Sequence, residues 1–126
     1  MKRILVNLSG HPAPRGAEEA FDKVVSVPVP NVDLGRAEAI KEAAQGLVKQ
    51  ALEDAELEDV LRHGEAAVIL PGASVLAGPV LAVLEGFSGT LPELFWAVRA
   101  EGGFVLPEKG IDLSELRLAG RALREG

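Results

Sequence analysis

Four short apolar runs alternate with longer segments of helical character, and this alternation leaves few folds open to the chain. The runs are rich in β-branched and aliphatic residues, as buried strands are. They lie at residues 3–8 (RILVNL), 24–29 (VVSVPV), 66–70 (AAVIL) and 94–99 (LFWAVR). Strands that alternate with helices predict an α/β fold with a mainly parallel sheet of about four strands and right-handed crossovers. A length of 126 residues predicts one domain, residues 1–126.

Helical periodicity is clearest in residues 36–54. Apolar residues recur there every three or four positions, with Glu, Lys and Gln opposite them. Shorter helical segments are expected at residues 16–22 and 56–62. The AEGG sequence predicts a hairpin turn into a short strand at residues 103–106, and Ser114 is expected to cap a last helix.

Pro79 restricts where the helix after the third strand begins. If Ser74 capped that helix, Pro79 would occupy its fifth position, where a missing N–H breaks the hydrogen-bond ladder. A start within residues 76–79, with Gly78 before Pro79 as the first helical residue, avoids this loss. Residues 71–78 are then expected to form a loop of mostly small residues.

Composition excludes several classes of function. The net charge of −6 argues against non-specific binding of duplex DNA. The absence of cysteine removes disulfides and thiolate metal sites, and it fits a cytoplasmic protein. No apolar run is long enough for a membrane span, and the basic start MKRILVNLSGHP predicts a strand rather than a signal peptide. The two histidines lack metal-ligand spacing, and His63 is expected at a helix C-terminus.

Sequence motifs for common cofactors and for hydrolases are absent. The chain has no GxGxxG, no Gly-Lys-Ser/Thr and no GxSxG, so no dinucleotide cofactor, P-loop or nucleophile elbow is expected. The acidic residues lie mainly on solvated helix faces and form no convincing acid–base pair. Ligands of open α/β sheets bind beyond the carboxyl ends of the strands. Those ends are expected to carry Asn7–His11, Pro30-Asn31, Pro71–Ser74 and Arg99 on one rim.

The loop Ser9-Gly10-His11-Pro12 has two interpretations. In the functional one, Gly10 lets a ligand approach the backbone, Ser9 offers a hydroxyl, and His11 donates a hydrogen bond or transfers a proton. In the structural one, Ser9 caps the following turn and His11 is solvated. The sequence leaves both open.

Two further features also have two interpretations. The backbone N–H groups of the loop at residues 71–78 either hold a phosphate at a helix N-terminus or belong to a tight strand–helix joint. Arg99 either neutralises a phosphate or marks the point where its strand reaches solvent, and Arg15 is a weaker case of the same kind. The loop residues concerned are Gly72, Ala73 and Ser74.

Three segments together resemble a known family. They are ILVNLSGHPAP, VVSVPV and VILPGASVLAGPVLAVLEGFSGTLPELFWAVR, which cover most of residues 3–99. They are similar to the small CRISPR-associated proteins that accompany type III systems. Those proteins have a compact Rossmann-like fold related to the CARF sensor domains, so the resemblance implies a single CARF-like domain.

The resemblance implies a ligand, the cyclic oligoadenylate second messenger of type III antiviral defence, with cyclic tetra-adenylate first. Some relatives are ring nucleases and others only bind the messenger; such proteins usually act as homodimers with the ring across the twofold axis. Ring opening there needs no metal, because a ribose 2′-hydroxyl attacks the neighbouring phosphodiester. On this basis His11 is expected as acid or base, with Ser9 and loop N–H groups on the phosphate. The expected ligand-binding residues are Asn7, Ser9, Gly10, His11, Arg15, Asn31, Gly72, Ala73, Ser74 and Arg99.

Three hypotheses follow for the function. The first is a metal-independent ring nuclease that lowers the messenger level by cleavage. The second is a binding protein that sequesters intact cyclic oligoadenylate, with protomers assembling around it. The third is a structural or protein-interaction subunit that uses the apolar second half of the chain. The sequence separates the first two poorly.

Overall fold

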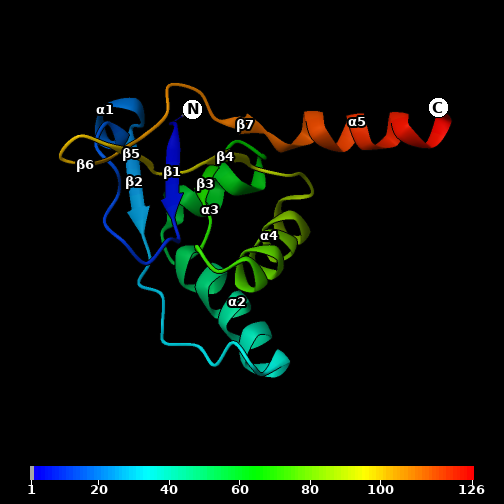
Figure 1. The fold of residues 1–126 in the computed structure, drawn as a ribbon, viewed down its shortest axis with the longest axis horizontal. Coiled ribbons are helices and arrows are strands. Elements are labelled where there is room, and N and C mark those ends of the chain that lie inside the picture. Colours follow the sequence, from blue (N-terminus) through cyan, green and yellow to red (C-terminus); the bar gives the residue numbers. More distant parts are fainter. Residues whose placement is uncertain (1) are drawn as a thin grey trace.

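The computed structural model describes residues 2–126, which form an α/β fold around a five-stranded sheet (Figure 1). The strand order is β2-β1-β3-β4-β7. The first four of these strands are parallel, and β7 pairs with β4 in the antiparallel direction. The mainly parallel sheet predicted from the sequence is therefore confirmed. Its strands are β1 (Ile4–Asn7), β2 (Lys23–Ser26), β3 (Ala67–Ile69), β4 (Glu93–Phe95) and β7 (Ile111–Asp112).

Helices cover both faces of the sheet. Alternate residues of each central strand point to opposite sides, and since they are apolar on both sides, each face is packed against a core. Ile4 and Val6 pack in the larger core with α2 (Ala37–Ala51), α3 (Ala55–Arg62) and α4 (Ser74–Ser88). Leu5 points the other way, to a smaller core that contains Phe21 and Phe95 in an edge-to-face contact. This second face carries the short helix α1 (Ala17–Ala20). The last helix, α5 (Leu113–Glu125), projects away from the body (Figure 1).

The predicted fourth strand is wrong beyond Phe95. The apolar run 94–99 divides into β4 and a separate strand, β5 (Val98–Ala100), with exposed Trp96 and Ala97 between them. β5 turns through Glu101-Gly102 into β6 (Gly103–Val105), and the two form an antiparallel hairpin outside the main sheet. The predicted hairpin is thus confirmed. The run could not show where the strand changes partner, because pairing partners are distant in sequence.

The predicted start of the fourth helix is also wrong. α4 begins at Ser74 and contains Pro79, and residues 74–78 are helical rather than loop. The early start places Leu76 in one buried stripe with Val80 and Leu84. Burial of such side chains contributes about 1.5–3 kcal/mol each. Since Val80 and Leu84 follow Pro79, the early start adds the burial of Leu76, which is comparable with the roughly 3 kcal/mol cost of one internal proline.

Of the other helices, α2 and α3 lie where the sequence predicted them, although α2 ends three residues before the predicted residue 54. α1 is a single turn, shorter than the helix expected at residues 16–22. One predicted cap is also wrong. Asp112, not Ser114, caps α5: its carboxylate accepts hydrogen bonds from the N–H groups of Ser114 and Glu115. Asp112 lies two positions before Ser114, at the N-cap, where its carboxylate reaches the free amides of the first turn. His63 is the C-cap of α3 as predicted, with Nδ1 2.8 Å from the Asp59 carbonyl oxygen.

An ion-pair cluster ties β2 to the start of α3. Lys23 Nζ lies 2.6 Å from an Asp54 carboxylate oxygen and 3.0 Å from one of Glu56. Asp54 also caps α3 by accepting from the N–H groups of Glu56 and Leu57. The Lys23 ammonium, followed by these backbone donors, lowers the pKa of Asp54 below its ordinary 3.8.

Acid is therefore expected to weaken the protein partly through Asp54. A carboxyl group with a lowered pKa stabilises the fold above its unfolded value, and this contribution is lost as the pH falls through the folded value. In urea unfolding at a series of acidic pH values, Asp54→Asn should reduce the loss of stability below pH 3.8, because the amide still caps the helix but cannot titrate. An unchanged pH profile in this variant would contradict the role of Asp54.

Candidate functional site

A crevice is expected between the carboxyl ends of β1 and β3. These strands are neighbours, but the chain leaves them in opposite directions. From β1 it passes through α1 on the smaller-core face to β2, and from β3 through α4 on the other face to β4. Such a reversal of direction is the usual ligand position in an open parallel sheet. The loops at residues 8–16 and 70–73 leave the sheet here.

Asn7 organises the first of these loops. Asn7 is 1% exposed, and within residues 2–126 it is the one polar residue among the buried apolar residues of the core. Its Nδ2 donates to the His11 carbonyl at 2.8 Å and to Ser26 Oγ at 3.2 Å. Its Oδ1 accepts from the Ser9 amide at 3.1 Å and from Ser9 Oγ at 2.6 Å. With its amide group used in this way, Asn7 shapes the loop rather than facing a ligand directly.

Ser9 and Gly10 explain how the loop turns. Ser9 Oγ accepts a hydrogen bond from the His11 amide at 3.1 Å, so the hydroxyl is part of the turn. Gly10 has φ +81°, and a Cβ at this position would lie 3.3 Å from Val29. The glycine therefore provides a left-handed turn against Val29. Both details match the structural interpretation of this loop, although Ser9 also lines the pocket described next.

A pocket of about 410 Å³ opens beside this loop, on the face that carries the hairpin. His11 lies at it as an exposed side chain, and its imidazole makes no hydrogen bond within residues 2–126. Most of the wall is apolar, with one exposed aromatic ring, Phe104, contributed by β6. The lining residues are Ser9, His11, Pro12, Ala13, Pro14, Ile69, Ala97 and Phe104.

The sequence prediction did not include the hairpin residues of this pocket. Ala97 has no distinctive sequence signal. Phe104 has one, since it is one of only four phenylalanines and sits in a short strand after a glycine-rich turn. Its approach to the first loop depends on long-range pairing: the Arg15 amide donates to the Phe104 carbonyl at 3.0 Å, and the Leu106 amide donates to the Arg15 carbonyl at 2.8 Å.

The two arginines expected at the site do different things. Arg15 Nη2 donates to the Glu101 carbonyl at 2.8 Å, so both its backbone and its side chain fasten the hairpin. Arg99 lies in the middle of β5, not at the exit of a buried strand. Its Cζ atom is 5.6 Å from the Phe104 ring centroid. Arg99 therefore lies over the ring of a lining residue, Phe104, and does not itself line the pocket.

The second loop delivers unpaired backbone donors to the same edge of the sheet. Ala73 is the N-cap of α4 and provides no side-chain cap. Its carbonyl accepts from the amides of Leu76 and Ala77, which leaves the amides of Ser74 and Val75 without an intrahelical acceptor. Gly72 and Ser74 are exposed. Residues 70–73 connect α4 to Ile69, the last residue of β3, which lines the pocket.

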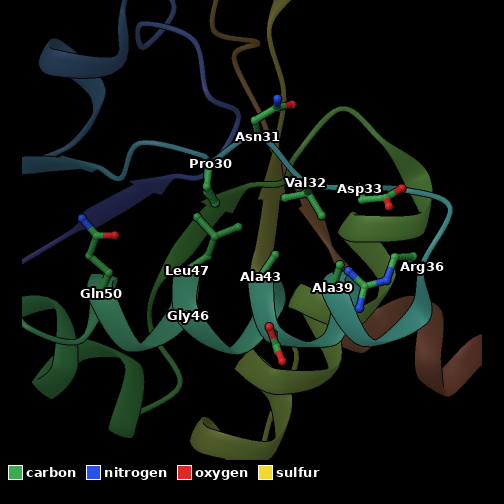
Figure 2. A pocket seen from close by; sticks show the side chains of 11 residues that line it. Pro30, Asn31, Val32, Asp33, Arg36, Ala39, Ala43, Gly46, Leu47 and Gln50 are labelled. Carbon is green, nitrogen blue, oxygen red and sulfur yellow. The ribbon is translucent and has the colours of Figure 1, made fainter.

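Asn31 belongs to a different hollow. A groove of about 540 Å³ lies between residues 30–36 and α2, with Ala39, Ala43 and Gly46 along its floor. Figure 2 shows the Asn31 amide turned away from α2, while Pro30 points toward Leu47. Val29, two residues earlier, contacts Gly10. Asn31 is thus close in sequence to the first loop but does not line the pocket of His11.

Neither a cluster of metal-ligating side chains nor a membrane-spanning helix is found in residues 2–126. Within residues 2–126, no three His, Asp or Glu side chains converge as metal ligands would. No helix in the same part of the chain combines the length and apolar character of a membrane span. Comparison with protein-family models, with curated proteins and with solved structures gives no match to this chain.

Proposed function

We propose that the chain binds cyclic oligoadenylate at the pocket beside the Ser9–Pro14 loop, with cyclic tetra-adenylate as the preferred ligand. By holding this messenger, the protein lowers its free concentration. The observation that carries the proposal is this largely apolar pocket, with an exposed Phe104 ring, at the β1/β3 reversal point. The resemblance to the CRISPR-associated proteins supplies the identity of the ligand.

The pocket suits a nucleobase. An adenine is flat and apolar on its faces, and it stacks on aromatic side chains. Phe104 is 49% exposed, and the Arg99 guanidinium lies over its ring, so the aromatic platform has a positive charge close by. Ser9 and His11 provide the polar edge of the same pocket.

The phosphates are proposed to meet the free amides of Ser74 and Val75 at the start of α4. A helix N-terminus attracts anions through its unpaired N–H groups and its dipole. This matters for a chain whose net charge of −6 repels anions at long range. Because a cyclic oligoadenylate repeats one unit, a homodimer in the cytoplasm would present the same donors to it twice.

Holding is favoured over cleavage because the loop lacks an oriented acid–base pair. The Ser9 hydroxyl is bound to Asn7 and to the His11 backbone. No carboxylate or other group fixes the His11 imidazole within residues 2–126. An efficient general base is normally positioned by such a partner.

Labelled cyclic tetra-adenylate, incubated with the pure protein in EDTA, tests the proposal. We expect an intact ring retained by the protein. Phe104→Ala should weaken binding roughly five- to hundredfold, since stacking on an aromatic side chain contributes about 1–3 kcal/mol per base. Trp96→Ala is the matched control, because Trp96 is a similarly exposed aromatic outside the pocket lining. Failure of the wild-type protein to bind at micromolar concentration contradicts the proposal.

Ring cleavage by His11 is the second candidate, favoured by the exposure of its free imidazole at the pocket. In that case the same incubation yields linear products. His11→Ala should then still retain the ring, through the Phe104 platform and the free amides of α4, and should stop its cleavage, because the imidazole that moves the proton is lost. Unchanged turnover in His11→Ala removes His11 from the chemistry.

A further inference from the structure

The last helix, α5, has no buried residue, and three of its leucines are large apolar side chains that are exposed. Leu116, Leu118 and Leu123 are 57%, 62% and 82% exposed. The helix extends away from the body and ends at the C-terminus (Figure 1). A helix of 13 residues is marginally stable in water by itself and normally depends on packing of one face.

One side of α5 forms a continuous apolar stripe. Leu116 and Leu123 are seven residues apart, so they lie on the same face, with Ala119 and Gly120 between them. Leu118 is on the opposite side of the helix, since two residues correspond to about 200° of rotation. The stripe therefore needs a cover that the body of the same chain does not provide.

The outer side of α4 is the complementary surface. α4 is apolar on most sides, yet Val75, Gly78, Ala82 and Gly86 face solvent at helical spacing. A Cβ at Gly78 or at Gly86 would meet nothing within 4 Å, so this side is open. A groove of about 360 Å³ runs along it, lined by Gly78, Leu81, Ala82, Glu85, Leu91 and Arg117.

The first turns of α5 already lie at this groove. Arg117 lines it, and an Arg117 guanidinium nitrogen is 4.0 Å from a Glu85 carboxylate oxygen. Beyond Arg117 the helix leaves its own α4 (Figure 1). Leu123, the most exposed leucine, is thus carried away from the groove of its own chain.

Charge indicates what covers the stripe. α5 carries three arginines and two glutamates, so its net charge is +1. Because the whole chain has a net charge of −6, the rest of the chain has a net charge of −7. The helix is thus attracted to the acidic body of any other copy, while two bodies without it repel each other.

We propose that α5 is an exchanged arm, whose Leu116–Leu123 stripe packs into the α4 groove of a second copy of this chain. Under twofold symmetry each copy gives one arm and receives one, so both exposed surfaces are covered at once. Leucine side chains on the arm fit a groove floored by glycine and alanine. The contact needs no ligand, and it stands or falls independently of cyclic oligoadenylate binding.

Sedimentation velocity on the full chain, without ligand, tests the arm. The wild type should sediment as a dimer. The double variant Leu116→Gln/Leu123→Gln should raise the dissociation constant roughly tenfold or more, because both apolar contacts are lost. Glutamine is a good helix former, and neither leucine is buried in the chain, so the protomer should keep its fold. Leu118→Gln, on the other face of α5, should remain dimeric.

A monomeric wild type at micromolar concentration overturns the proposal, as does a double variant that dimerises normally. Cross-linking then tests the position of the contact. The chain has no cysteine, so Ala82→Cys in a tagged copy and Leu123→Cys in an untagged copy introduce one thiol each. Oxidation of the mixture should join tagged to untagged chains, and Leu118→Cys should not replace Leu123→Cys. Absence of the mixed product overturns the placement on α4.

Discussion

Replacing Asn7 by alanine is expected to lower the free energy of unfolding by about 1–3 kcal/mol, the cost of leaving a buried polar group unpaired. The change removes four hydrogen bonds that join the end of β1 to Ser9, His11 and Ser26. The loop beside the pocket then loses its fixed shape. We therefore also expect cyclic tetra-adenylate binding to fall about tenfold or more, because Ser9 and His11 at the polar edge of the pocket are no longer pre-organised.

Urea unfolding and ligand titration of Asn7→Ala measure these two effects separately. Asn31→Ala is the matched control, since it removes the same side chain from an exposed position at a different groove. We expect its stability to change by less than about 0.5 kcal/mol. Equal effects of the two substitutions would show that burial and hydrogen bonding of Asn7 do not organise the loop.

Leu84→Ala is expected to produce a larger loss of stability, about 2–5 kcal/mol. Leu84 is 1% exposed and belongs to the core between the sheet and helices α2, α3 and α4. The substitution leaves a cavity in this core, because the packed neighbours relax only partly. Since folded domains are stable by only about 5–15 kcal/mol, this change removes a large share of the total.

The midpoint of urea unfolding measures the effect of Leu84→Ala. Leu118→Ala removes the same atoms from a leucine that is 62% exposed on α5, and a shift within about 0.5 kcal/mol is expected. If both variants lost stability equally, the burial pattern of α4 described above would be incorrect.

The sequence was sufficient for elements whose signal is local. The periodicity of residues 36–54 predicted α2, and the apolar runs at residues 3–8 and 66–70 predicted β1 and β3. It also placed His63 at a helix C-terminus and the turn before β6 correctly. In each case the determining residues lie within a few positions of one another.

The errors arose where distant contacts outweigh a local preference. Pro79 argued for a late start of α4, but the buried stripe of Leu76, Val80 and Leu84 extends the helix past it. The run 94–99 resembled one strand, yet its second half pairs with β6 instead of β3. Neither outcome can be read from nearby residues, because the interactions that decide it come from other parts of the chain.

The candidate site shows the same division. The order of strands and helices by itself predicted a mainly parallel sheet, since the hand of parallel crossovers is fixed by backbone chirality, and it placed the candidate site at the carboxyl edge of that sheet. Only the tertiary structure brought Phe104 beside His11, tied Arg15 to the hairpin and separated Asn31 into another groove. The physical reason is that the pocket wall forms by pairing of residue 15 with residues 104–106, a long-range contact whose closure depends on the whole fold.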